Sequence, residues 1–541
     1  MKLIRLVFVY TFLTAILLSS CVDKKSLDNS EKVFRYNEHS DITSLDPAFA
    51  RDQRNIWAVH QLYSTLVGLD NQLKIIPQAA KSWEISNDGL CYTFKLREDV
   101  YFHKSDVFKD PLHKLTAHDV KFSLERLSDK KLASPGSEIL RVVDEIIVVD
   151  KHTIKFMLNK PFPAFLGVLS MKYCSILPEE VGQGKIDFRS NPVGSGPFRF
   201  KRWIPQEKLV LRKNELYFEK DQKGNQLPYL EAVAITFLPD KQSEFMQFIQ
   251  GNLDFISGLD VSYKDELLRA NGELNSKYQK KINVDKSPYL NTEYVGFYLA
   301  DSSSHVTDIR IRKAINMGFD RDKMIKYLRN GIGIAANQGF IPKGLPGWSL
   351  NNNGYTYNPE KARKLIEEYK REKQIQQDIQ VTFSTNASYQ DLIGFIQAEL
   401  SEIGIKVNIN VLPSSTLRMK RSEGQLEAFR SSWIADYPDA QNYLSLFYSK
   451  NKSPIGSNYT HFESKLFDSI YNSAIKTINA DLREKLYSRL DSIIIKEAAI
   501  VPLYYDEAIR FKHKNIMGLN INPINLLDLT RVKKLKSEIL D

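Results

Sequence analysis

The chain has 541 residues, of which 43% are hydrophobic and 26% are charged, and its formal net charge is +10 at pH 7. A chain of this length is too long for a single hydrophobic core, so the sequence predicts two or three lobes. The positive charge does not indicate nucleic-acid binding, because Lys and Arg are interspersed with Asp and Glu and no basic cluster is interleaved with aromatic residues. We therefore expect no nucleic-acid partner.

The first residues of the chain are typical of a secretory signal. Two cationic residues precede an apolar stretch over residues 6–18, which is shorter than the roughly 20 residues that a membrane-spanning helix needs. The segment Leu18-Ser19-Ser20-Cys21 follows and resembles the lipobox of bacterial lipoproteins. We expect a signal peptide over residues 1–20, then a lipidated Cys21 that opens a flexible polar tether over residues 21–32. A plain signal peptide with a chance cysteine is the alternative.

If Cys21 is lipidated, the protein is anchored to a membrane of the cell envelope and faces the periplasm or the exterior. The sequence leaves open which membrane carries it. An exported chain can form disulfides, but Cys91 and Cys174 both lie in apolar contexts. We expect two separate buried thiols.

Alternating apolar residues predict strands, and apolar residues at helical spacing predict helices. In chain order, the predicted strands cover residues 33–36, 91–96, 146–149, 153–158, 208–212, 232–238, 381–384 and 406–411. The predicted helices cover residues 117–127, 242–249, 308–317, 320–328, 359–369, 388–403 and 482–497. Because helices and strands alternate along the chain, the sequence predicts an α/β fold with mixed sheets.

Several patterns that suggest catalysis or metal binding are incomplete. Gly194-Ser195-Gly196 lacks the G-x-S-x-G spacing of a serine nucleophile and precedes Pro197-Phe198, which favours a turn. The histidines His103, His113 and His118 lack the H-x-x-x-H spacing of a helical zinc site. We therefore expect no enzyme, no metal and no cofactor.

Five separated segments, in order along the chain, make the sequence recognisable. They are residues 41–48 with 62–67, residues 191–198 (NPVGSGPF), residues 308–316 (DIRIRKAIN) with 319–321 (FDR), residues 357–362 (YNPEKA) with 400–407, and residues 433–439 (WIADYPD). The last four are similar to the motifs PVGTGPF, VRxAxxxAxDR, YDPEKA with LxxxGIxV, and WxADYxxP. Because these motifs occur together in family 5 of the bacterial solute-binding proteins, the chain resembles the oligopeptide, dipeptide and nickel binders of ABC importers.

The resemblance implies a periplasmic-binding-protein-like fold (type II, cluster C), a Venus flytrap with an extra inserted domain. It places domain I at residues 33–70, 186–283 and 501–541, domain II at 71–185 and domain III at 284–500. Ligand would be enclosed between domains I and III, whereas domain II has no known share in binding. A monomer is usual for the family.

The implied function is capture of peptides outside the cytoplasmic membrane and their delivery to an ABC permease, with ATPase subunits that supply the energy. A binder of the same fold for a nickel chelate or an oligosaccharide is the first alternative. A lipid-anchored hydrolase is a further alternative, although we find no nucleophile-base pair.

Four residues are candidates for ligand contact. By resemblance, Asp436 pairs with the ammonium group of a peptide, since a carboxylate accepts hydrogen bonds and an ammonium only donates them. Arg430 would help to hold the ligand's carboxylate through its bidentate guanidinium. Trp433 and Tyr437 would pack on ligand side chains, with burial in a domain core as an equal alternative.

Overall fold

The computed structural model describes residues 32–260, 262–350 and 354–536. The predicted signal peptide, Cys21 and all but the last residue of the tether lie outside this part of the chain. Within the described ranges, no helix combines the length and the apolar character needed to cross a membrane.

The first lobe, which we call lobe I, is built on a four-stranded sheet. Its order is β1 (Val33–Asn37), β10 (Ala232–Thr236), β9 (Lys208–Lys213) and β8 (Phe198–Ile204), with β1 parallel to β10 and the other pairs antiparallel. Helix α3 (Gln53–Leu62) packs on this sheet and buries Trp57, Val59 and Leu62. Asp52 caps the helix by accepting a hydrogen bond of 3.2 Å from the backbone N–H of Asn55.

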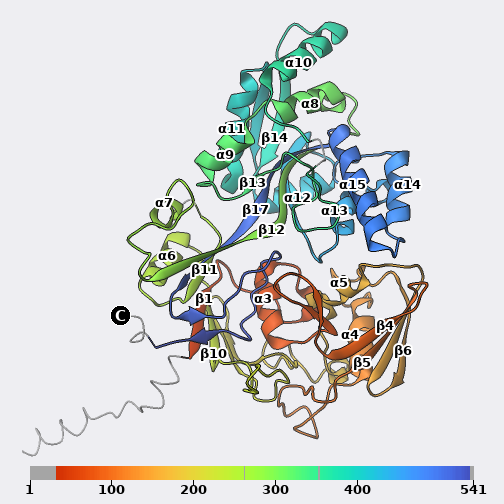
Figure 1. The fold of residues 1–541 in the computed structure, drawn as a ribbon, viewed down its shortest axis with the longest axis vertical. Coiled ribbons are helices and arrows are strands. Elements are labelled where there is room, and N and C mark those ends of the chain that lie inside the picture. Colours follow the sequence, from red (N-terminus) through yellow and green to blue (C-terminus); the bar gives the residue numbers. More distant parts are fainter. Residues whose placement is uncertain (1–31, 261, 351–353, 537–541) are drawn as a thin grey trace, which may run out of the picture.

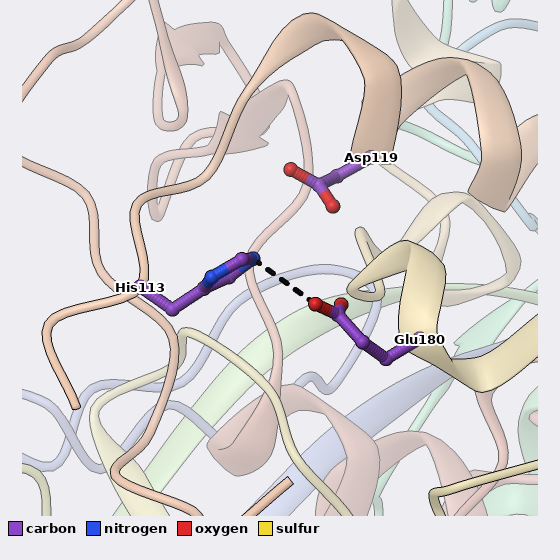
Figure 2. Close-up of side chains that lie close together, drawn as sticks. All are labelled: His113, Asp119 and Glu180. Carbon is purple, nitrogen blue, oxygen red and sulfur yellow. Dashed lines mark ion pairs between the residues drawn. The ribbon is translucent and has the colours of Figure 1, made fainter. Parts of the chain in front are cut away.

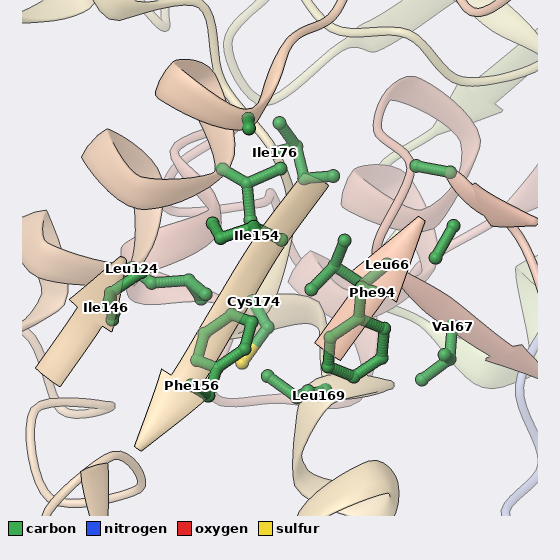
Figure 3. Close-up of a cluster of buried hydrophobic side chains, with 14 of the residues drawn as sticks. Leu66, Val67, Phe94, Leu124, Ile146, Ile154, Phe156, Leu169, Cys174 and Ile176 are labelled. Atoms are coloured by element: carbon green, nitrogen blue, oxygen red, sulfur yellow. The ribbon is translucent and has the colours of Figure 1, made fainter. Parts of the chain in front are cut away.

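Lobe II contains a second four-stranded sheet, in the order β4 (Ala80–Ile85), β5 (Cys91–Leu96), β7 (Thr153–Leu158) and β6 (Val143–Asp150). Helices α4 (Ala117–Leu127) and α5 (Phe165–Leu169) contribute side chains to its core. Figure 3 shows Phe94 and Phe156 from the sheet packed with Leu169 and Cys174. Both cysteines are free thiols, as predicted, and Cys174 is buried, whereas Cys91 is only half-buried and not buried as predicted.

Lobe III is organised around a seven-stranded mixed sheet, drawn in the upper part of Figure 1. Its main path is β11 (Phe255–Ser257), β17 (Ile500–His513), β12 (Ile282–Phe297), β16 (Ala428–Ile434), β14 (Ile379–Thr385) and β15 (Ile405–Val411), and β13 (Ile334–Ala335) pairs with β17. The helices of this lobe are α8 (Ile309–Met317), α9 (Arg321–Leu328), α10 (Pro359–Lys373), α11 (Gln390–Ser401), α12 (Ser414–Ser422), α13 (Gln441–Leu444), α14 (Lys465–Ala474) and α15 (Ala480–Lys496).

Two long antiparallel strands, β12 and β17, connect the lobes. Their paired register runs from Ile282 opposite His513 to Gly296 opposite Ile500. In Figure 1 the pair extends from the upper lobe down to β11 and α6 (Lys241–Ile249), beside the sheet of lobe I. The remaining short elements are β2 (Val67–Leu69), β3 (Ile75–Pro77), α7 (Lys264–Leu267), β18 (Ile516–Met517) and β19 (Lys533–Lys534).

The predicted elements are confirmed, with differences at their ends. Strands 91–96 and 153–158 and helix 117–127 have the predicted bounds. The helix predicted over residues 388–403 is shorter, since a 3-10 turn at Ala387–Tyr389 precedes α11 and Gly404 ends the segment with φ +85°. The predicted domain boundaries stay predictions.

Candidate ligand-binding site between the lobes

Two adjoining cavities lie where the three lobes meet. The first has a volume of about 460 Å³ and the second of about 510 Å³. Both are lined by Asp52, Gln53, Trp57 and Tyr289, so they share one wall. The first cavity is completed by residues 170–173 of lobe II and by residues 434–436 at the end of β16. Lobe II, which corresponds to the inserted domain with no known share in binding in the family, thus contributes to the wall of the first cavity.

Asp436 lies in the wall of the first cavity, in the bend that follows β16. Its side chain is exposed to the cavity, yet the lobes surround it closely enough that desolvation raises the pKa of its carboxyl group. Asn442 opposes this shift by donating a hydrogen bond of 3.0 Å to Asp436 Oδ2. The carboxylate thus has one neutral partner and an open side that faces the cavity.

Trp433 contributes to this arrangement indirectly. Its indole N–H donates a hydrogen bond of 2.7 Å to Asn442 Oδ1, which leaves the amide N–H₂ of Asn442 to donate to Asp436. Its half-buried ring packs against the core of lobe III, and it does not line either cavity. The structure thus places Trp433 behind Asp436.

Tyr437 is buried at the contact between lobes III and II. It joins the core cluster of lobe II, and its Cβ lies close to Gly167 in α5. Its hydroxyl group donates a hydrogen bond to the side chain of Gln441. Tyr437 is absent from the walls of both cavities, so its position matches the alternative of a core residue.

Arg430 is buried on β16 and already has a carboxylate partner. It pairs with Glu293 of β12, and its guanidinium carbon lies 3.2 Å from the ring centre of Tyr389. Tyr389 lines the second cavity, whereas Arg430 lines neither. Because Glu293 already pairs with one guanidinium nitrogen of Arg430 in a buried ion pair, a ligand carboxylate would compete with Glu293 for that group.

A second ion pair stands beside the first. Arg329 donates to Asp506 Oδ1 at 2.7 Å, and both residues line the second cavity. Asn291 connects the two acids, with hydrogen bonds of 3.1 Å to Glu293 and 3.3 Å to Asp506. This network fixes the charged groups of lobe III to one another.

Glu38 lines the second cavity from the side of lobe I. Its side chain is buried and its Oε1 has no hydrogen-bond partner within the described residues. Burial raises the pKa of Glu38 to about 8, although Lys241 opposes the shift. No motif or spacing in the sequence indicated a role for this residue.

Lys172 was also missed by the sequence analysis. It lines the first cavity from lobe II, next to Tyr173, although its side chain is only 8% exposed. Burial lowers the pKa of its ammonium group to about 8, which the nearby Asp528 opposes. A lysine between Met171 and Tyr173, in an otherwise apolar run, was the signal that could have identified it.

A separate cluster of titratable side chains lies in lobe II. Figure 2 shows His113, Asp119 and Glu180 close together, with ligand-type atoms all within 4.8 Å of one another. His113 Nε2 lies 3.7 Å from Glu180 Oε1. Both oxygens of Asp119 are already engaged, by Thr116 in a capping box and by the backbone N–H of residue 179. These three residues line neither cavity between the lobes.

Relatives share most of the length of this chain. The dipeptide-binding protein of Escherichia coli (strain K12) is 25% identical over 493 residues, which cover 86% of this chain and 87% of the relative. Heme-binding protein A of Haemophilus influenzae is 29% identical over 471 residues, which cover 82% of this chain and 81% of that relative.

Solved structures show the same fold. The ABC transporter-associated periplasmic binding protein DppA from Helicobacter pylori, solved in complex with the peptide STSA, superimposes with a TM-score of 0.78 at 28% identity. The alignment covers 93% of this chain and 98% of that protein. This similarity confirms the predicted periplasmic-binding-protein-like fold.

The family assignment rests on the middle of the chain. Residues 74–454 match the model of the bacterial extracellular solute-binding proteins, family 5 Middle. This span contains four of the five motif segments and all four predicted ligand-contact residues. The chain belongs to family 5 of the bacterial extracellular solute-binding proteins.

Proposed function

We propose that this protein is the substrate-binding subunit of an ABC importer and that it binds peptides in the cavity lined by Asp436. The carrying observation is the carboxylate of Asp436, which faces the cavity with a neutral amide as its side-chain partner. The surrounding lobes partly desolvate this exposed carboxylate, and the ammonium group of a peptide would supply both an opposite charge and three hydrogen-bond donors.

The relatives support a peptide over the other solutes. Proteins that match this chain along most of its length are named for dipeptides and for di- and tripeptides, and DppA from H. pylori was solved with a peptide bound. The name of Heme-binding protein A shows that this family also binds other ligands. Neither an oligosaccharide nor a neutral chelate needs a carboxylate at this position.

The cellular setting is proposed on the same basis. As a member of an extracellular binding family, the protein would deliver its ligand to a permease that is powered by separate ATPase subunits. Lipidation of Cys21 would anchor it at the membrane, and the protein would act as a monomer without catalysing a reaction. The segment that supports the anchor is Leu18-Ser19-Ser20-Cys21.

Calorimetric titration of the full chain in mild detergent tests this function. Peptides of two to five residues with free amino groups are expected to bind, and N-acetylated peptides of the same sequence to bind roughly 10- to 100-fold more weakly, because a charged hydrogen bond contributes about 1.5–3 kcal/mol. Asp436→Asn should lose this discrimination. Asp391→Asn, an exposed aspartate on α11, is the matched control.

Hemin, nickel–histidine and an oligosaccharide form the comparison set. If one of these binds and no peptide does, the peptide assignment is wrong while the family assignment stands.

A further inference from the structure

Lys172 has no partner for its charge. Its side chain is 8% exposed, and within the described residues its ammonium group takes part in no ion pair or hydrogen bond. Removing an ammonium group from water without pairing it is costly, so such groups are normally compensated. The atoms of Lys172 line the first cavity, which means that a compensating anion could come from there.

The backbone holds Lys172 in this position. It begins the 3-10 turn Lys172–Cys174, and the carbonyl group of Lys172 accepts hydrogen bonds from the hydroxyl group of Ser175 at 2.7 Å and from its N–H at 3.2 Å. Two residues on, Cys174 is anchored in the core of lobe II. These contacts hold the backbone of the turn in place, with Lys172 in the wall of the first cavity.

The other acids of the cavity wall are already engaged. Asp52 caps α3, and Glu219 binds the hydroxyl group of Tyr217 at 2.9 Å and Arg531 at 3.0 Å. Asp528 is the acid that raises the pKa of Lys172. Its own side chain is half exposed and accepts a hydrogen bond from the backbone N–H of residue 530. No acid in the described chain lies within 4.0 Å of the Lys172 ammonium group.

The cavity thus carries opposite charges at separate points of its wall. Asp436 is negative and Lys172 is positive, and they do not pair with each other. Tyr173 lies between these two charged groups. It follows Lys172 in sequence, and its pKa is raised first by burial and then by the nearby charge of Asp436. A ligand with an ammonium group at one end and a carboxylate at the other matches this pattern.

Two other cations are less suitable for the carboxylate. Arg430 is paired with Glu293 and lines neither cavity. Arg51 lines the first cavity but is exposed, so water already solvates it and a ligand would gain less from pairing with it.

We propose that Lys172 binds the C-terminal carboxylate of a short peptide whose amino group is held by Asp436. The proposal rests on the function proposed above. It gives lobe II a direct part in ligand recognition and makes the free carboxylate a condition for tight binding. Because an extended chain spans at most about 3.6 Å per residue, the distance between the two charges sets the preferred length.

The test compares free-acid peptides with their C-terminal amides on the full chain in mild detergent, by calorimetry. The wild type should bind the acid roughly 10- to 100-fold more tightly than the amide. Lys172→Met and Lys172→Gln should weaken binding of the acid to the level of the amide and leave the amide unchanged. Lys185→Met, at an exposed lysine of lobe II, is the matched control and should behave as the wild type.

The outcomes separate the two proposals. If no peptide binds the wild type, the proposed function fails. If peptides bind, and both Lys172 variants keep the full preference for the acid, the role of Lys172 is refuted while the function stands. Loss of that preference in Arg51→Met instead would assign the carboxylate to Arg51. Thermal unfolding of each variant establishes that it is folded. The neutral side chains should not lower the unfolding midpoint below that of the wild type.

Discussion

Asn442 donates a hydrogen bond of 3.0 Å to the carboxylate of Asp436 and accepts one of 2.7 Å from the indole N–H of Trp433. The indole therefore determines which end of the amide faces the acid. The three residues form a chain from the core of lobe III to the cavity wall, which holds Asp436 in one orientation.

Removing the middle of this chain should weaken ligand binding. Asn442→Ala deletes one hydrogen bond to Asp436 and frees its side chain, so we expect peptide affinity to fall by about 1 kcal/mol, or roughly fivefold. Calorimetry measures the change. Because Asn442 acts through Asp436, the variant should have no further effect in an Asp436→Asn background. An equal loss in both backgrounds would show that Asn442 acts by another route.

Peptide binding should weaken at mildly acidic pH. Desolvation by the surrounding lobes raises the pKa of Asp436, so protonation begins at a higher pH than for an ordinary aspartate and removes the charge that holds the ammonium group. Affinity measured from pH 7 downwards should decrease in the wild type. Asp436→Asn should show a flat profile in the same range.

The raised pKa of Asp436 affects the stability of the ligand-free protein in the opposite direction to its effect on ligand binding. A carboxyl group with a raised pKa binds more protons in the folded state, so its charge destabilises the ligand-free protein at neutral pH. Asp436→Asn should therefore unfold at the same or a higher temperature than the wild type without ligand. A lower midpoint would indicate that the carboxylate has a structural role.

The preference for a free C-terminal carboxylate should disappear at alkaline pH. Burial lowers the pKa of Lys172 to about 8, with Asp528 and Cys174 as the groups that oppose the shift, and His60 lies close enough to be affected by the lysine. Above pH 8 Lys172 of the ligand-free protein loses its ammonium charge. Lys172 must then take up a proton before it can bind a carboxylate. The affinities of acid and amide should converge between pH 8 and 10, and Lys172→Met should show no such convergence.

Arg430 should prove to be more important for stability than for the ligand. Arg430→Met leaves the carboxylate of Glu293 buried without its cation, which should destabilise the protein by about 3–5 kcal/mol. Urea unfolding measures the loss, and the double variant Arg430→Met with Glu293→Gln should recover much of it. If Arg430→Met instead keeps its stability and loses the preference for acids over amides, Arg430 is the carboxylate ligand.

The backbone at Gly194 should not accept a side chain. A Cβ atom at Gly194 would lie 2.1 Å from the carbonyl oxygen of Leu62 at the end of α3, so Gly194→Ala should destabilise the protein by about 1–3 kcal/mol. Gly394 in α11 has open space around it, and Gly394→Ala should stabilise by about 0.5–1 kcal/mol. Chemical unfolding of both variants checks the pair, and equal effects would contradict the argument.

The sequence was sufficient for the elements and the family. Local patterns set them, since the alternation in residues 153–158 and the helical spacing in residues 117–127 are properties of neighbouring residues. The motif around Asp436, a short and distinctive segment, predicted ligand contact for that residue, and the structure places it in the wall of the first cavity. Helix ends were less predictable, as at residues 388–403, where a 3-10 turn competes with the α-helix.

Only the tertiary structure decided which side chains face the cavity. Arg430 and Lys172 are both basic residues in partly apolar segments, yet one is paired with Glu293 from a distant strand and the other is left without an anion. Tyr437 belongs to the motif of residues 433–439 but packs against lobe II. Trp433, in the same motif, contacts Asn442 and not the cavity. These differences depend on contacts between residues far apart in the chain, which spacing and composition do not encode.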